Sequence, residues 1–136
     1  MHAPSTQTII DSVFKMLGIA PEDTLNALYS LYNKGYISYP RTESTSLDKD
    51  HIKDVPAILF SIFQSNYHDV WITKYLLEID STSFKDGVLD DDSLNFVHRA
   101  ITPTERLVDK NNLTDIEERV NAFVISHYLL LFNTRE

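Results

Sequence analysis

The chain has 136 residues, of which 43% are hydrophobic and 24% are charged, a size and composition typical of one globular domain covering residues 1–136. It has no cysteine, which excludes disulfides and cysteine-ligated zinc, and it has no apolar run long enough to span a bilayer. Its net charge of −8 argues against tight nucleic-acid binding by the chain alone, because such affinity comes mainly from neutralising phosphates.

Two helices are predicted at the start of the chain. Apolar residues recur at helical spacing over residues 6–17, and Gly18 follows where a left-handed residue commonly ends a helix. Pro21 is tolerated in the first turn of a second helix, over residues 22–34, which Gly35 ends. A helix, a short glycine-containing turn and a second helix are typical of helix-turn-helix and winged-helix domains, and we expect this pair to act as a scaffold.

Five segments are predicted after the helix pair. Residues 36–39 are aromatic and β-branched, so we expect a short strand there. Residues 48–55 have the polar side chains of a helix start. Residues 57–63 form an apolar run that begins after Pro56, so a second helical segment is predicted there. Apolar side chains at helical spacing predict a further helix over 69–79, whereas 81–95 is predicted to be an exposed connection.

The last part of the chain is predicted to be extended and then helical. Residues 97–104 contain a late proline, so we expect extended backbone with one short strand at most. The pattern of residues 114–117 is a capping box, which opens a helix that ends near Phe132. Its predicted buried face comprises Ile116, Val120, Phe123, Val124, Tyr128 and Leu131. The sequence therefore predicts a mainly α fold with a few short β-strands, of the helix-turn-helix or winged-helix-like type.

The segment Gly35–Ser46 carries the most reactive grouping of side chains. Tyr39 offers a phenol that can attack phosphorus, and Arg41 offers a planar guanidinium that binds phosphate oxygens. In extended backbone these two side chains point to the same side, so both could address one phosphate, and Pro40 stiffens the backbone between them. The residues alone leave a second interpretation open, in which Tyr39 is a core tyrosine at a strand end and Arg41 lies in a surface turn, paired with Glu43.

Two blocks of this sequence resemble the type IA DNA topoisomerases. Residues 35–44, Gly-Tyr-Ile-Ser-Tyr-Pro-Arg-Thr-Glu-Ser, are similar to the family's active-site motif, G-Y-I-T-Y-P-R-T-D-S. Residues 97–104, Val-His-Arg-Ala-Ile-Thr-Pro-Thr, are similar to the family's A-H-x-A-I-x-P-T and follow in the family's order at about its separation. The similarity extends from about residue 5 to residue 132, and Tyr-Pro-Arg-Thr suggests the topoisomerase III kind.

The resemblance implies roles for residues of both blocks. Tyr39 would attack the DNA backbone, stay joined to the 5′ phosphate and release the 3′ hydroxyl, while Arg41 would bind the phosphate and stabilise its charge. His98 matches the family's histidine that contacts the phosphate at the cleavage site, and a protonated imidazole would donate a hydrogen bond there. Thr42 and Ser44, in the same motif as the tyrosine, are further candidates for DNA contacts.

Two positions depart from the family's pattern. Glu43 stands where the family usually has Asp, which keeps the charge but lengthens the side chain by one methylene. Arg99 stands where the family more often has Glu or His, so the resemblance implies no role for it. We expect the Arg99 side chain to be solvated.

The resemblance also implies what surrounds this domain. The family's full enzyme cleaves one strand, passes another through the gate and reseals the first without ATP. Its Mg²⁺-binding acidic cluster lies in a separate toprim domain, and nothing in this sequence matches that cluster, so we expect no metal bound by this chain. We expect two partners, single-stranded DNA at the cleavage site and the remaining topoisomerase domains, and we expect the isolated chain to be inactive. With no signal-peptide pattern, a cytoplasmic location is favoured.

Other interpretations of these residues stay open. The chain could be a non-catalytic winged-helix-like module that binds DNA or protein, or it could dimerise through surfaces that neighbouring domains cover. A metal site at the acidic run 90–92, or at His68 and Asp69, is disfavoured, because no second ligand cluster accompanies either. Tyr36 could stack on a base, but packing in the core is favoured.

Overall fold

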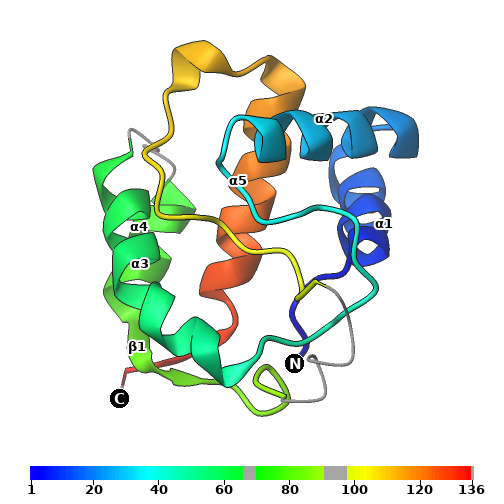
Figure 1. The fold of residues 1–136 in the computed structure, drawn as a ribbon. Coiled ribbons are helices and arrows are strands. Elements are labelled where there is room, and N and C mark those ends of the chain that lie inside the picture. The colour runs from blue at the N-terminus through cyan, green and yellow to red at the C-terminus, as the bar shows by residue number, and fades with distance from the viewer. Residues whose placement is uncertain (66–69, 91–97, 136) are drawn as a thin grey trace.

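The computed structural model describes residues 1–65, 70–90 and 98–135. In chain order the elements are α1 (Thr6–Leu17), α2 (Pro21–Asn33), the 3₁₀ helix η1 (Lys49–Asp54), α3 (Val55–Gln64), α4 (Val70–Glu78), β1 (Ile79–Phe84), the 3₁₀ helix η3 (Lys110–Asn112), α5 (Asp115–Leu129) and β2 (Phe132–Thr134) (Figure 1). The predicted mainly α fold with a few short strands is confirmed. No helix within the described ranges is both long and apolar enough to cross a membrane.

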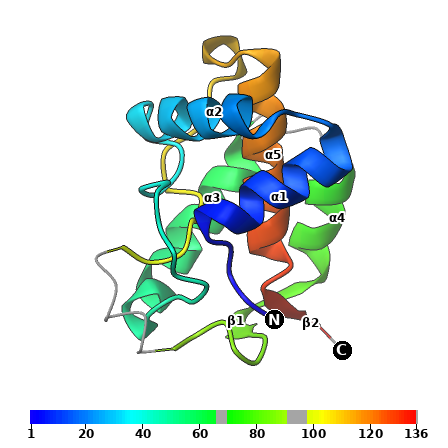
Figure 2. The same ribbon diagram turned by 90° about the vertical axis from the view of Figure 1, so that its right-hand side faces the viewer.

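Helix α5 lies at the centre of the fold. Helices α1 and α2 pack against one side of it and α4 against another, with α3 packed on α4 (Figure 1). Figure 2 looks onto α1, which crosses in front of α5. One cluster of buried apolar side chains lies among α1, α2 and α5, and a second lies beneath α3, α4 and the sheet. Tyr36, Ile37 and Ile101 belong to the first cluster, so the predicted core packing of Tyr36 is confirmed and both topoisomerase-like segments rest on this core.

Capping explains where α1 and α5 begin and where α1 ends. Ser5 caps α1 with a reciprocal capping box, and Gly18 ends that helix in the left-handed conformation at φ 68°. Thr114 and Glu117 form the capping box of α5, so both predicted helix starts are confirmed. Ile116, in contrast, is 37% exposed, and its predicted place in the buried face is wrong. It lies at the rim of a shallow groove between α2 and the start of α5, outside the apolar cluster.

The two-stranded sheet corrects the prediction for two segments. Residues 79–84 form β1, although residues 81–95 were expected to be an exposed connection, and α5 ends at Leu129 so that Phe132 begins β2. The strands pair antiparallel, with Ile79 opposite Thr134. The Phe84 and Phe132 rings stack with their centroids 4.4 Å apart. This pairing joins segments far apart in the sequence, which local periodicity does not report.

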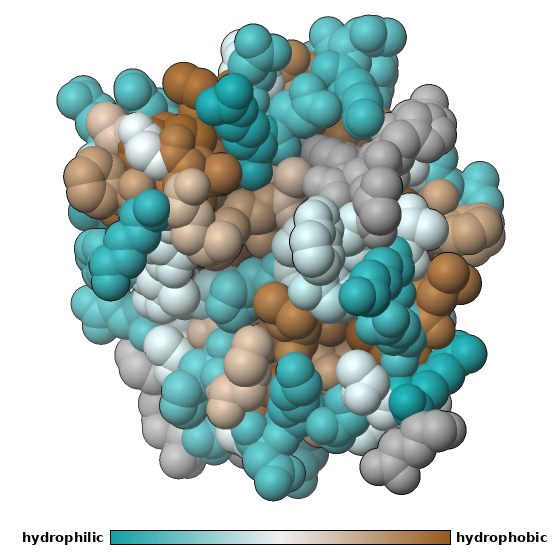
Figure 3. Space-filling view, turned by 180° about the vertical axis from the view of Figure 1, so that it is seen from behind, coloured by the Kyte–Doolittle hydropathy of each residue, from teal (hydrophilic) through white to brown (hydrophobic). Residues whose placement is uncertain are grey.

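Several large apolar side chains remain on the surface. They lie at the end of α1 and on the outer faces of α3 and α4, and they include Phe14, Met16, Phe60, Phe63, Trp71 and Leu77. The face seen from behind has brown apolar areas separated by teal polar ones (Figure 3). Surfaces of this kind are compatible with association. Dimerisation stays a prediction that sedimentation at several concentrations would test.

Candidate active site

The two topoisomerase-like segments lie side by side and hydrogen-bond through their backbones. Ile37 and Pro103 form an isolated antiparallel bridge, which is all that the structure retains of the strand predicted over residues 36–39. The Ser38 N–H donates to the Thr102 carbonyl at 2.9 Å, and the Thr102 N–H donates to the Ser38 hydroxyl oxygen at 2.9 Å. Segments more than 60 residues apart are thereby fixed in register, which places Tyr39 beside the start of the second block.

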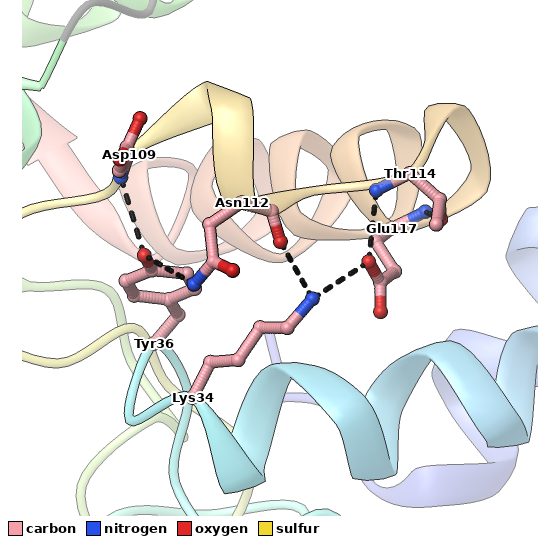
Figure 4. Close-up of polar contacts among 6 residues, drawn as sticks. All are labelled: Lys34, Tyr36, Asp109, Asn112, Thr114 and Glu117. Carbon is pink, nitrogen blue, oxygen red and sulfur yellow. Dashed lines mark hydrogen bonds and ion pairs between the residues drawn. The ribbon is translucent and has the colours of Figure 1, made fainter.

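A polar cluster anchors the N-terminal end of the tyrosine segment to the start of α5 (Figure 4). The Lys34 ammonium group lies 3.0 Å from a Glu117 carboxylate oxygen and also donates to the Asn112 carbonyl. The buried Tyr36 hydroxyl accepts from the Asp109 N–H at 3.3 Å and from the Asn112 side-chain amide at 3.4 Å. Lys34 and Tyr36, which flank Gly35, are therefore both held by contacts with residues 109–117.

Glu117 is the electrostatic centre of this anchor. Burial alone would raise the pKa of its carboxyl group. Hydrogen bonds from the Ser30 hydroxyl, the Thr114 N–H and the Lys34 ammonium group outweigh burial and lower that pKa to about 2. The anchor is therefore ionised and intact at neutral pH.

Tyr39 lies between two other aromatic side chains and is half-buried. The Tyr32 ring meets it edge-on with centroids 5.3 Å apart, and the His98 ring lies against it with centroids 4.1 Å apart and planes tilted by 34°. The Tyr39 hydroxyl forms no hydrogen bond with any residue that the structure describes. The phenol is thus held by its ring, and none of the described residues engages its oxygen.

Tyr39 and His98 line one cleft with a volume of about 520 Å³. Its charged lining comes from Asp54, Arg99 and Glu105. The cleft contains the phenol and the imidazole that the resemblance singled out, although the two residues are 59 positions apart in the sequence. A phosphodiester that entered it would meet both groups.

Arg41 does not line the cleft that contains Tyr39 and His98. It is exposed and lines a second hollow, together with residues of α1 that include Thr6 and Gln7. Its side chain forms no hydrogen bond or ion pair with the described residues, so the pairing with Glu43 that the second interpretation would use is not formed. The structure brings Tyr39 and His98 together in one cleft and places Arg41 in a neighbouring hollow, not on the same wall as the phenol.

Thr42 and Ser44 are buried, and their hydroxyl groups are engaged inside the protein. The Thr42 hydroxyl donates to the His98 carbonyl at 3.0 Å. The Ser44 hydroxyl donates to the Ser46 carbonyl at 3.1 Å. In this conformation the two side chains order the backbone of residues 42–46, and Thr42 ties this segment directly to His98.

An ionic network that the sequence did not predict forms one wall of the cleft. A guanidinium nitrogen of Arg99 lies 3.2 Å from a carboxylate oxygen of Asp48, and a second lies 3.8 Å from Asp54. The same guanidinium lies 3.2 Å from Nδ1 of His51, whose Nε2 lies 2.8 Å from the Tyr128 hydroxyl. Arg99 is therefore not the solvated side chain that we expected.

The pKa values of two buried members of this network, His51 and Tyr128, are shifted. Burial, followed by the positive charge of Arg99, lowers the pKa of His51 to about 4. Burial also raises the pKa of Tyr128 well above its ordinary value. Asp48, His51 and Tyr128 carry no motif, and a polar helix start was the only signal near the first two. Sequence reasoning could not have joined them to Arg99.

The residues considered from sequence as metal ligands lie almost entirely outside the part of the chain that the structure describes. His68, Asp69, Asp91 and Asp92 lie outside the described residues. Within the described ranges, no three His, Cys, Asp or Glu side chains are grouped so that they could hold a metal ion.

Comparison with known proteins gives a consistent result. A family model described as DNA topoisomerase matches residues 3–135. DNA topoisomerase 1 of Bacillus anthracis is 26% identical over 113 residues, which are 83% of this chain and 12% of that protein. DNA topoisomerase 1 of Pyrococcus horikoshii is 27% identical over 131 residues, 96% of this chain and 18% of that protein. DNA topoisomerase 3 of Staphylococcus haemolyticus is 28% identical over 116 residues, 82% of this chain and 15% of that protein. The chain thus spans less than a fifth of the length of these relatives.

Proposed function

Because the chain belongs to the type IA DNA topoisomerase family, we propose that it is the domain that carries the active-site tyrosine and that this residue is Tyr39. One observation carries the proposal: Tyr39 lines a cleft, its hydroxyl makes no hydrogen bond with the described residues, and the His98 ring lies against its ring. Tyr36, the other tyrosine of the motif, is buried and uses its hydroxyl internally.

The proposed reaction exchanges one phosphate ester for another. The Tyr39 oxygen attacks phosphorus, the bond to the 3′ oxygen breaks, and the phenolic proton ends on that leaving oxygen. A free phenol ionises near pH 10, so the attack needs a neighbouring positive charge or a base. The product is a 5′-phosphotyrosine, and because the ester count is unchanged, the strand can be resealed without ATP.

His98 and Arg41 are proposed to bind the phosphate backbone. His98 would donate a hydrogen bond to an oxygen of the phosphate under attack, which its place beside Tyr39 supports. Arg41 has an unengaged, exposed guanidinium in the neighbouring hollow, so we propose that it binds the same strand next to the cleavage site. Thr42 and Ser44 would act by ordering residues 42–46, which follow Arg41 and are tied to His98.

The further parts of a topoisomerase cycle are proposed to need other domains. The net charge of −8 disfavours strong binding of DNA by this chain alone. Mg²⁺, which the resemblance implies for the enzyme, does not fit a ligand set among the described residues, and we propose that a toprim domain holds it. Strand passage, and hence relaxation or decatenation, would likewise require the domains that the relatives possess beyond this segment.

The test is to trap a covalent adduct in a topoisomerase polypeptide that contains these residues together with a toprim domain. A single-stranded oligonucleotide labelled at its 3′ end should leave its label on the protein, whereas a 5′ label should be released. Tyr39→Phe should abolish the adduct. Tyr36→Phe is the matched control and should retain it. Retention of the adduct by Tyr39→Phe would overturn the proposal.

The alternative is a non-catalytic module that binds DNA or protein, and of these two partners the net charge of −8 favours protein. The two functions give different results with the same pair of variants. If neither Tyr39→Phe nor Tyr36→Phe changes the behaviour of the polypeptide on DNA, the module is the better description.

A further inference from the structure

The guanidinium of Arg99 contacts three side chains. One of its nitrogens lies beside Asp48, whose side chain is only 10% exposed. The other lies beside Asp54, at the solvent edge, and beside the buried His51. Three such partners restrict the movement of the Arg99 side chain and, through it, of the backbone at this position.

The hydrogen-bond directions within this network follow from the chemistry of its members. A guanidinium can only donate, so Nδ1 of His51 accepts from Arg99. The imidazole is neutral at ordinary pH, because burial lowers the pKa of His51 to about 4, and its proton therefore lies on Nε2. That N–H then donates to the hydroxyl of Tyr128, a core residue of α5. A continuous chain of contacts thus joins the centre of the fold to the wall of the cleft.

Charge argues against a direct role for Arg99 in binding phosphate. Asp48 and Asp54 together carry one more charge than the single guanidinium neutralises, and Glu105 adds another carboxylate to the cleft lining. The charge of the guanidinium is therefore already compensated by its own carboxylate partners, and an effect of Arg99 on the site would pass through a neighbour.

The neighbour that needs support is His98. No residue that the structure describes hydrogen-bonds to its ring nitrogens, so the orientation of the ring depends on its backbone and on the Tyr39 ring. On the backbone, the His98 carbonyl accepts from Thr42, and the Ala100 N–H donates to the Ser46 carbonyl at 3.2 Å. Arg99 lies between these two hydrogen-bonded residues, His98 and Ala100.

We propose that Arg99, clamped by Asp48, Asp54 and His51, is a positioning residue that holds His98 against Tyr39. The catalytic consequence rests on the proposed function, whereas the geometric claim does not.

The geometric claim is tested by NMR on the 136-residue chain. With the two rings 4.1 Å apart, the ring protons of His98 and Tyr39 should show strong mutual NOEs, and those of His98 should be shifted upfield. Arg99→Gln should reduce these NOEs by more than half, while NOEs between Tyr128 and Phe132 in the core persist. Arg99→Lys, which keeps a cation beside Asp48, should restore most of the signal. Arg119→Gln, at an exposed site on α5, is the matched control and should change nothing.

A second variant covers the case in which Arg99→Gln does not fold because Asp48 is left unpaired. Asp48→Asn combined with Arg99→Gln removes both charges of the close pair and should still lose the His98–Tyr39 NOEs. A folded variant of either kind with unchanged NOEs would overturn the proposal.

A functional experiment separates this inference from the proposed function. In the polypeptide used for adduct trapping, Arg99→Gln should slow cleavage by about tenfold or more with little change in KM, since small misplacements of a catalytic group cost rate. If Tyr39→Phe still forms the adduct, the proposed function fails while the NMR result stands. If Arg99→Gln loses the NOEs but cleaves at the normal rate, the positioning of His98 has no catalytic value.

Discussion

Glu117→Gln tests the anchor beneath the tyrosine segment. Glutamine can still accept from the Thr114 N–H and from Lys34, so the substitution removes the charge and leaves the hydrogen-bond pattern largely in place. The pKa of Glu117 falls from 4.5 to about 2 on folding, which corresponds to about 3 kcal/mol at most. Lys34 is 26% exposed, and solvent screening brings our expectation down to about 1–2 kcal/mol.

The sign of the pH dependence follows from the lowered pKa. The folded chain keeps Glu117 ionised when the unfolded chain has already bound a proton, so the stabilisation is complete above pH 4.5 and is lost as the pH falls toward 2. Urea unfolding of both chains at pH 7, 4.5, 3 and 2 measures this. The difference in free energy of unfolding should be largest at pH 7 and should approach zero near pH 2. Groups common to both chains cancel in the difference, so a gap that does not vary with pH would refute the reasoning.

Further predictions concern other parts of the site. Gly35→Ala places a Cβ at φ +84°, 2.9 Å from the Arg106 side chain, and should cost about 1 kcal/mol or more in urea unfolding, whereas Gly18→Ala lacks the close contact and should cost less. Tyr32→Ala removes the edge-on contact with Tyr39 and should broaden the Tyr39 ring signals in NMR spectra, while Tyr32→Phe, which keeps the ring, should not. Because the pKa of His51 is lowered from 6.5 to about 4, the unfolded chain binds a proton first, and the free energy of unfolding should fall as the pH drops through that range. His51→Gln should flatten that slope, and an equal slope in both chains would contradict the assignment.

The helices could be predicted because their signals are local. Ser5 with Gly18, and Thr114 with Glu117, mark ends that depend on neighbouring residues only, and the structure places α1 and α5 accordingly. The strands β1 and β2 could not be predicted, because each is stabilised by a partner about 50 residues away. Ile116 has the right spacing for the core but lies at the rim of a groove, and periodicity does not show where a core ends.

The candidate site likewise has residues that the sequence could identify and contacts that depend on distant parts of the chain. Tyr39 and His98 were identified by resemblance to a family, and their contact depends on backbone pairing between two distant segments. Arg41 was expected to point to the same side as Tyr39, because side chains two residues apart share a side in extended backbone. The segment instead forms only a single bridge before the chain turns toward α1. Arg99 looked like a solvated side chain because its partners, Asp48 and His51, become neighbours only after folding.

The most direct test of the central claim is to locate the nucleotide on the trapped adduct by mass spectrometry. Trypsin should release residues 35–41 as one peptide, which contains both Tyr36 and Tyr39. We predict that, after nuclease digestion, fragment ions carry the residual nucleotide mass on Tyr39. The same mass on Tyr36, or on a peptide from any other part of the polypeptide, would contradict it.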